Sequence, residues 1–137
     1  MTAQPERVFL DTNIALYLVR WDAVKTPVAQ SILRSPSITR VISTQVLSEF
    51  VNVSRKKAGL SWEEVRRDAG HLRSLCRVDP VTEDVIEEAL GLGAVHQFSW
   101  YDAVVVASAL SAGANRLLTE DMQDGRKFGA MTIVNPF

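Results

Sequence analysis

Four acidic residues in distant parts of this 137-residue chain have the type and position to bind a metal ion together: Asp11, Glu49, Asp102 and Asp121. Asp11 closes the apolar run 7–11, and Asp121 follows the apolar run 116–119. Ligands of open parallel sheets bind beyond the carboxyl ends of the strands, so we expect both residues at one rim of a sheet. Each also has an ordinary structural use, because Asp11 can cap a helix and Asp121 lies in a polar turn.

Asp102 and Glu49 lie within expected helices. The helix of Asp102, at about 100–112, is apolar nearly all round and should be buried, where an unpaired carboxylate costs several kcal/mol. A bound cation would offset that cost. Glu49 lies at the edge of the apolar face of its helix, which is a common position for glutamate, so its assignment depends on the other three acids.

The chemistry of such a set follows from its charge. Clustered carboxylates repel one another unless a cation or protons neutralise them, and ligands that are all oxygen suit Mg²⁺ or Mn²⁺. One or two bound metal ions lower the pKa of water and so support phosphodiester hydrolysis near neutral pH. Thr119 and Asn13 carry uncharged polar groups suited to orienting a carboxylate, a water molecule or a phosphate beside the ligands.

Other metal chemistry and a membrane location are not indicated. The single cysteine, Cys76, excludes an internal disulfide and a cysteine-rich zinc site, and the two histidines, His71 and His96, lie outside the expected rim. No apolar run approaches the ~20 residues that span a bilayer, and the first eleven residues contain no apolar stretch of signal-peptide length. We therefore expect a cytoplasmic protein.

The pattern of strands and helices predicts how these residues are positioned. Apolar or β-branched runs predict strands at 7–11, 37–42, 76–78, 116–119 and 131–134. Capping residues and apolar periodicity predict helices at about 13–20, 27–34 after Thr26, 44–58 after Ser43 or Thr44, 62–75 after Ser61, 83–95 after Thr82, and 100–112 after Ser99. This alternation predicts one α/β domain over residues 1–137, with a mainly parallel sheet covered on both faces.

The formal net charge of −1 conceals an uneven distribution of charge. Residues 55–77 carry seven basic groups against three acids, whereas residues 78–125 carry nine acids against one arginine. Arg55, Lys56 and Lys57 begin the basic segment, which could attract a polyanion such as RNA. The alternative is that these charges only solvate helix faces.

The sequence resembles the PIN-domain nucleases, in particular the VapC-like toxins of toxin–antitoxin pairs. The matching segments occur in the family's order: VFLDTN at 8–13, STQVLSEF at 43–50, SWYDA at 99–103 and LLTED at 117–121. The resemblance implies an α/β/α sandwich that cleaves RNA with Mg²⁺ or Mn²⁺. It also implies a homodimer and an antitoxin whose tail blocks the acidic pocket.

The resemblance places Asp11, Glu49, Asp102 and Asp121 on the family's acidic quartet and Thr119 on its hydroxyl position. The fourth acid is the least definite of these, because Glu120 and Asp124 flank Asp121 and either could share its role.

Two other classes of protein remain as alternatives. A receiver-type signalling domain also places aspartates at a sheet rim, but it needs a lysine after a late strand, and Lys127 instead lies before the run 131–134. A nucleic-acid-binding module could keep the fold with weak catalysis or none. The intact set of four acids argues against this second alternative.

Overall fold

The computed structural model describes residues 4–137, which form one six-stranded sheet in the order β3-β2-β1-β4-β6-β5. Neighbouring strands run parallel except for β5, which pairs antiparallel with β6 at one edge. The strands are β1 Glu6–Leu10, β2 Ile38–Ser43, β3 Arg77–Asp79, β4 Arg116–Leu118, β5 Lys127–Phe128 and β6 Met131–Val134.

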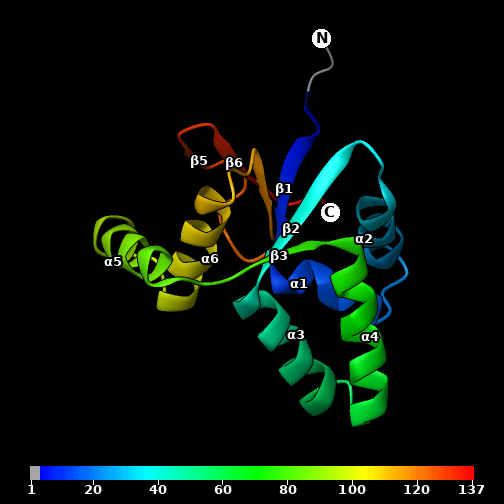
Figure 1. Ribbon diagram of the computed structural model, residues 1–137. Coiled ribbons are helices and arrows are strands. Elements are labelled where there is room, and N and C mark those ends of the chain that lie inside the picture. Colours follow the sequence, from blue (N-terminus) through cyan, green and yellow to red (C-terminus); the bar gives the residue numbers. More distant parts are fainter. Residues whose placement is uncertain (1–3) are drawn as a thin grey trace.

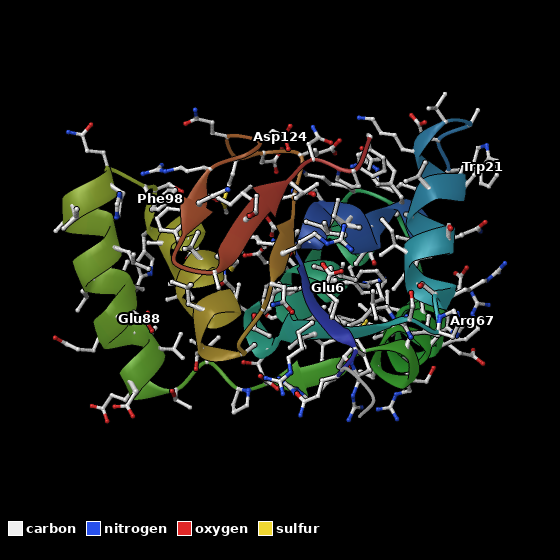
Figure 2. All side chains as sticks on the ribbon, turned by 90° about the horizontal axis from the view of Figure 1, so that it is seen from above. Glu6, Trp21, Arg67, Glu88, Phe98 and Asp124 are labelled. Atoms are coloured by element: carbon white, nitrogen blue, oxygen red, sulfur yellow. The ribbon has the colours of Figure 1, made fainter. Side chains whose placement is uncertain are left out.

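Helices cover both faces of this sheet. Figure 1 shows α5 and α6 on one side and α2 and α4 on the other, while α3 extends beyond the sheet beside α4. Seen from above, α5 and α2 lie at opposite ends of the molecule (Figure 2). The expected three-layer α/β/α fold is therefore confirmed. The helices are α1 Thr12–Ala15, the 3₁₀ turn η1 Leu16–Leu18, α2 Lys25–Arg34, α3 Thr44–Lys56, α4 Trp62–Leu75, α5 Glu83–His96 and α6 Trp100–Ser111.

The core lies along the central strands. Because helices cover both faces of these strands, their apolar residues follow one another without alternating with polar ones. The buried apolar residues of β1, β2 and β4 are Val8, Phe9, Leu10, Val41, Ile42, Leu117 and Leu118.

α6 is apolar all round because it packs both on the sheet and on α5. Val105 and Val106 belong to the main core, whereas Ala103 and Val104 pack with Val85 of α5 in a second cluster. This double burial fixes the N-terminal turn of α6, where Asp102 lies, against the body of the protein.

The N-terminal caps expected from the sequence are found at four helices. The hydroxyls of Ser43, Ser61, Thr82 and Ser99 each accept a backbone N–H in the first turn of α3, α4, α5 and α6. Ser61 and Glu64 complete a capping box. Because a cap satisfies N–H groups that would otherwise lack a partner, it sets where each helix begins.

The first two helices and one strand differ from expectation. The segment 13–20 divides into α1 and η1, and Thr26 is not a cap, because α2 already begins at Lys25. Asp22 Oδ1 instead accepts the N–H groups of Val24 at 2.9 Å and Lys25 at 2.8 Å, while the Thr26 hydroxyl donates to the Tyr17 carbonyl. The edge strand β5 has only two residues, which is too short for a sequence pattern.

Across residues 4–137, none of the helices combines the length and apolar character needed to cross a bilayer.

Candidate active site

Asp11 and Thr119 are neighbours because β1 and β4 run parallel and end side by side. Leu10 lies opposite Leu118, and the Asp11 N–H donates to the Leu118 carbonyl at 3.0 Å. The Thr119 hydroxyl donates to Asp11 Oδ2 at 2.9 Å, and the Thr12 N–H donates to Asp11 Oδ1 at 2.7 Å. These bonds hold the Asp11 carboxylate in one orientation at the sheet rim.

Asp11 is only 6% exposed, and this burial governs its protonation. Loss of solvent raises the pKa of Asp11 to about 6, although the hydrogen bonds from Thr12 and Thr119 act in the opposite direction. The negative charges of Glu49 and Asp102 raise it further. The acids are therefore close enough to repel one another, which is the condition under which a cation stabilises such a set.

Glu49 projects from α3 and is tied to the segment that follows β1. The Thr12 hydroxyl donates to Glu49 Oε2 at 2.8 Å, and Gln45 Nε2 donates to Glu49 Oε1 at 2.9 Å. Sequence reasoning missed both partners. Gln45 precedes Glu49 by one helical turn, a spacing at which side chains meet, and Thr12 directly follows Asp11, so both had a local signal.

Asp102 lies in the first turn of α6, where its own N–H donates to the Ser99 hydroxyl at 3.3 Å. Partial burial raises the pKa of Asp102, the Ser99 hydroxyl lowers it, and the charges of Asp121 and Glu49 raise it. The packing of α6 between the sheet and α5 thus places the half-buried carboxylate of Asp102 near the other acids.

Asn13 connects Asp121 to the strand ends. Its Nδ2 donates to Asp121 Oδ2 at 2.9 Å and to the Thr119 hydroxyl at 3.1 Å, with a longer contact of 3.4 Å to Asp11 Oδ2. The Asp121 N–H also donates to the Thr119 hydroxyl at 3.2 Å. The two polar residues chosen from the sequence, Asn13 and Thr119, therefore contact the acids they were expected to orient.

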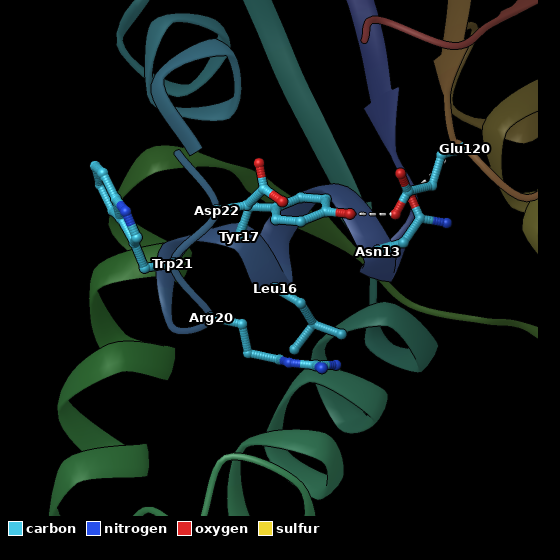
Figure 3. A pocket seen from close by; sticks show the side chains of 7 residues that line it. All are labelled: Asn13, Leu16, Tyr17, Arg20, Trp21, Asp22 and Glu120. Carbon is cyan, nitrogen blue, oxygen red and sulfur yellow. Dashed lines mark hydrogen bonds between the residues drawn. The ribbon is translucent and has the colours of Figure 1, made fainter. Parts of the chain in front are cut away.

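The two acids that flank Asp121 have other partners. Glu120 accepts the Tyr17 hydroxyl at 2.5 Å and Lys25 Nζ at 2.8 Å, and it lines a neighbouring pocket (Figure 3). Asp124 Oδ1 accepts the Asn135 N–H at 2.8 Å, which holds the C-terminal segment.

All four acids line one cavity of about 200 Å³. Asp11 and Asp102, which are 91 positions apart in the sequence, are thus on the same side of the molecule. Neither Glu120 nor Asp124 lines this cavity. The lining residues are Asp11, Thr12, Asn13, Leu16, Gln45, Glu49, Val53, Tyr101, Asp102, Val105 and Asp121.

The donors around the cavity suit a divalent ion by their chemistry. Within residues 4–137, no three His, Cys, Asp or Glu side chains are already grouped as a metal site. The charged groups at the cavity are nevertheless all carboxylates, which are the ligands of Mg²⁺ and Mn²⁺. The Gln45 amide oxygen is buried there without a partner among the described residues. The residues present therefore fit a hard cation.

The basic residues expected to bind RNA lie at the far end of α3. Arg55 has its guanidinium 4.3 Å from the Trp62 ring centre and donates to the Leu60 carbonyl at 2.7 Å. Lys56 and Lys57 are exposed. Lys56 follows Glu49 by seven residues, so it lies on the same helix face, about 10 Å further along the axis.

Comparison with known families gives one match that spans most of the chain. Residues 8–123 match the family described as the PIN domain. A search of curated proteins finds no significant match.

Three solved structures share the fold of this chain. A toxin–antitoxin complex from Klebsiella pneumoniae is 20% identical, with a TM-score of 0.74 over 95% of this chain and 98% of the other. VapC20 from Mycobacterium tuberculosis, described as a sarcin-ricin loop cleaving toxin, is 24% identical, with a TM-score of 0.64 over 80% and 86%. FitAcB from Neisseria gonorrhoeae is 18% identical, with a TM-score of 0.65 over 94% and 97%.

Proposed function

Since the chain belongs to the PIN domain family, we propose that it is a ribonuclease dependent on Mg²⁺ or Mn²⁺ and the toxin of a toxin–antitoxin pair. The observation that carries this proposal is the convergence of Asp11, Glu49, Asp102 and Asp121 on one cavity. Four segments far apart in the sequence supply these acids, and core packing alone gives no reason to bring like charges together.

The metal would be held by carboxylates of this set, with Asp11 as the buried and most firmly oriented member. When bound, the metal would lower the pKa of a water molecule and neutralise charge on the phosphate that is cleaved. The chain's own contribution is to fix the ligands. Thr119 and the Thr12 backbone orient Asp11, Asn13 orients Asp121, and Thr12 with Gln45 orients Glu49.

Removing the divalent metal is expected to abolish cleavage of RNA, with a fall of at least about 100-fold in rate. The measurement is cleavage of labelled RNA by purified protein with Mg²⁺ or Mn²⁺, with EDTA, and after the ion is restored in excess. Cleavage that continues unchanged in EDTA would contradict the proposal.

Two protein partners are part of the proposal. One of the matched structures is a toxin–antitoxin complex, which supports an antitoxin partner for this chain. We propose that this antitoxin inhibits the chain, and that both are cytoplasmic. We also propose a homodimer. Light scattering, read against the chain mass of 15.2 kDa, tests the dimer, and loss of RNA cleavage in the purified complex tests the antitoxin.

Lys56 and Lys57, with the less accessible Arg55, are proposed to hold the RNA backbone beside the acids. Replacing Lys56 and Lys57 together with glutamine is expected to weaken RNA binding and to lower the slope of log affinity against log salt by about 0.7 for each phosphate that the variant no longer neutralises. Lys127→Gln, which removes one charge from an exposed lysine on the edge strand β5, is the control for loss of a lysine elsewhere on the surface. A salt slope equal to that of the wild type would show that the two lysines only solvate the end of the helix.

A further inference from the structure

The N-terminal turn of α6 exposes two adjacent aromatic rings. Trp100 is 41% exposed and Tyr101 is 67% exposed, although residues 103–109 of the same helix are all buried. The Ser99 cap and the packing of α6 on both sides fix this turn, so the rings cannot be buried by a shift of the helix. Exposed apolar side chains held rigidly next to a cavity are typical of a contact site.

The two rings line a hollow that borders the acid cavity. The hollow has a volume of about 300 Å³ and is walled largely by apolar side chains. Tyr101 and Gln45 line both the hollow and the acid cavity, and Tyr101 directly precedes Asp102. The hollow is therefore within reach of an extended molecule held at the acids. The residues that line it are Thr44, Gln45, Val81, Ile86, Trp100, Tyr101 and Val104.

We propose that the hollow receives the base of a nucleotide next to the phosphate that is cleaved, and that this base stacks on the ring of Tyr101. This inference rests on the proposed function and names the residue that would contact a base of the substrate. A nucleotide has the two properties that the site demands, since its phosphate suits a metal held by the acids and its base has a flat apolar face.

Stacking on Tyr101 selects against duplex RNA. In an A-form helix each base is already stacked and paired, and the deep, narrow major groove keeps side chains out. In a loop or a single strand the base can turn outward and stack on an aromatic ring, largely whatever its sequence. Tyr101 is thus a specificity-determining residue, and Trp100 and Val104 line the hollow beside it.

The test combines variants of Tyr101 with an RNA that lacks one base. The substrate is an oligoribonucleotide with one cleavage site, made intact or with an abasic residue on the 5′ or the 3′ side of the scissile phosphate. We expect Tyr101→Ala to lower kcat/KM about 5- to 150-fold on intact RNA, the loss typical of one stacked base. Tyr101→Phe keeps the ring and should stay within about twofold of the wild type.

The abasic substrate distinguishes stacking from a general defect. At one of the two positions, the abasic RNA should be cleaved by the wild type about as slowly as intact RNA is cleaved by Tyr101→Ala. The Tyr101→Ala variant should cleave this abasic RNA and intact RNA at the same rate, because the base then has no ring on which to stack. Val95→Ala, which truncates a 74% exposed side chain of α5 outside the hollow, is the control and should leave kcat/KM unchanged.

Three results would overturn the inference. Wild-type rates for Tyr101→Ala would show that the ring contacts no substrate. Equal losses for this variant on intact and abasic RNA, accompanied by a change in molecular mass by light scattering, would assign the hollow to a second copy of the chain. If the wild type cleaves no RNA, the inference fails together with the proposed function. If the wild type cleaves RNA but the losses from Tyr101→Ala and from the missing base add up, only the inference is refuted.

Discussion

Asp102→Asn is expected to lower the rate of RNA cleavage by at least about 100-fold and to leave the fold intact. Changes beside a metal ligand already cost about 10- to 100-fold, and asparagine removes the charge of a proposed ligand itself. The fold should tolerate the change, because burial and the charges of Asp121 and Glu49 disfavour the ionised form of Asp102.

Glu88→Gln is the matched control for this variant. Glu88 is an exposed carboxylate on α5 (Figure 2) and does not line the acid cavity, so the same chemical change there should leave cleavage unaltered. Both variants are purified in the same way and compared by cleavage rate and circular dichroism. A well-folded Asp102→Asn protein that cleaves RNA at the wild-type rate would remove Asp102 from the site.

Asp11→Asn is expected to raise the free energy of unfolding of the metal-free protein by about 1–2 kcal/mol near pH 7.5. The pKa of Asp11 is raised from 3.8 to about 6, so ionisation of this buried group costs up to about 3 kcal/mol of stability. Asparagine avoids that cost. Part of the gain is offset because its amide makes weaker hydrogen bonds with Thr12 and Thr119 than a carboxylate does.

The pH dependence of this effect has a definite sign. Between about pH 4 and pH 6 the folded protein holds a proton on Asp11 that the unfolded chain has released, so the stability of the wild type falls as the pH rises through this range. Above that range, the contribution of Asp11 to the free energy of unfolding no longer changes with pH. Asp11→Asn lacks this decline, and its advantage over the wild type should therefore grow from pH 4 to pH 6.

Urea unfolding in EDTA at several pH values measures the difference. Mg²⁺ should then stabilise the wild type by mass action and have less effect on the variant, since the variant lacks a ligand. A metal-free variant that is less stable than the wild type at pH 7.5 would show that the hydrogen bonds of Asp11 outweigh the cost of burying its charge.

The sequence predicted the parts of the site that depend on regular structure. Asp11 and Asp121 follow strands, and parallel strands end at one rim of a sheet. The alternation of strands and helices in the sequence was therefore enough to predict that these two residues lie close together. Asp102 stood out because a carboxylate interrupts a helix that is apolar all round. Glu49 had no such signal, because glutamate is common at the edge of a helix face, and only its contacts with Thr12 and Gln45 tie it to the cavity.

Strand ends, helix caps and buried faces were readable in this chain because they are set by neighbours one turn or two residues apart. Only the tertiary structure decided the directions of Glu120, Asp121 and Asp124. In that irregular turn, side chains follow no period, and their partners Tyr17, Lys25, Asn13 and Asn135 come from elsewhere in the chain. The same holds for Tyr101, whose position beside the acids is set by the packing of α6 between the sheet and α5.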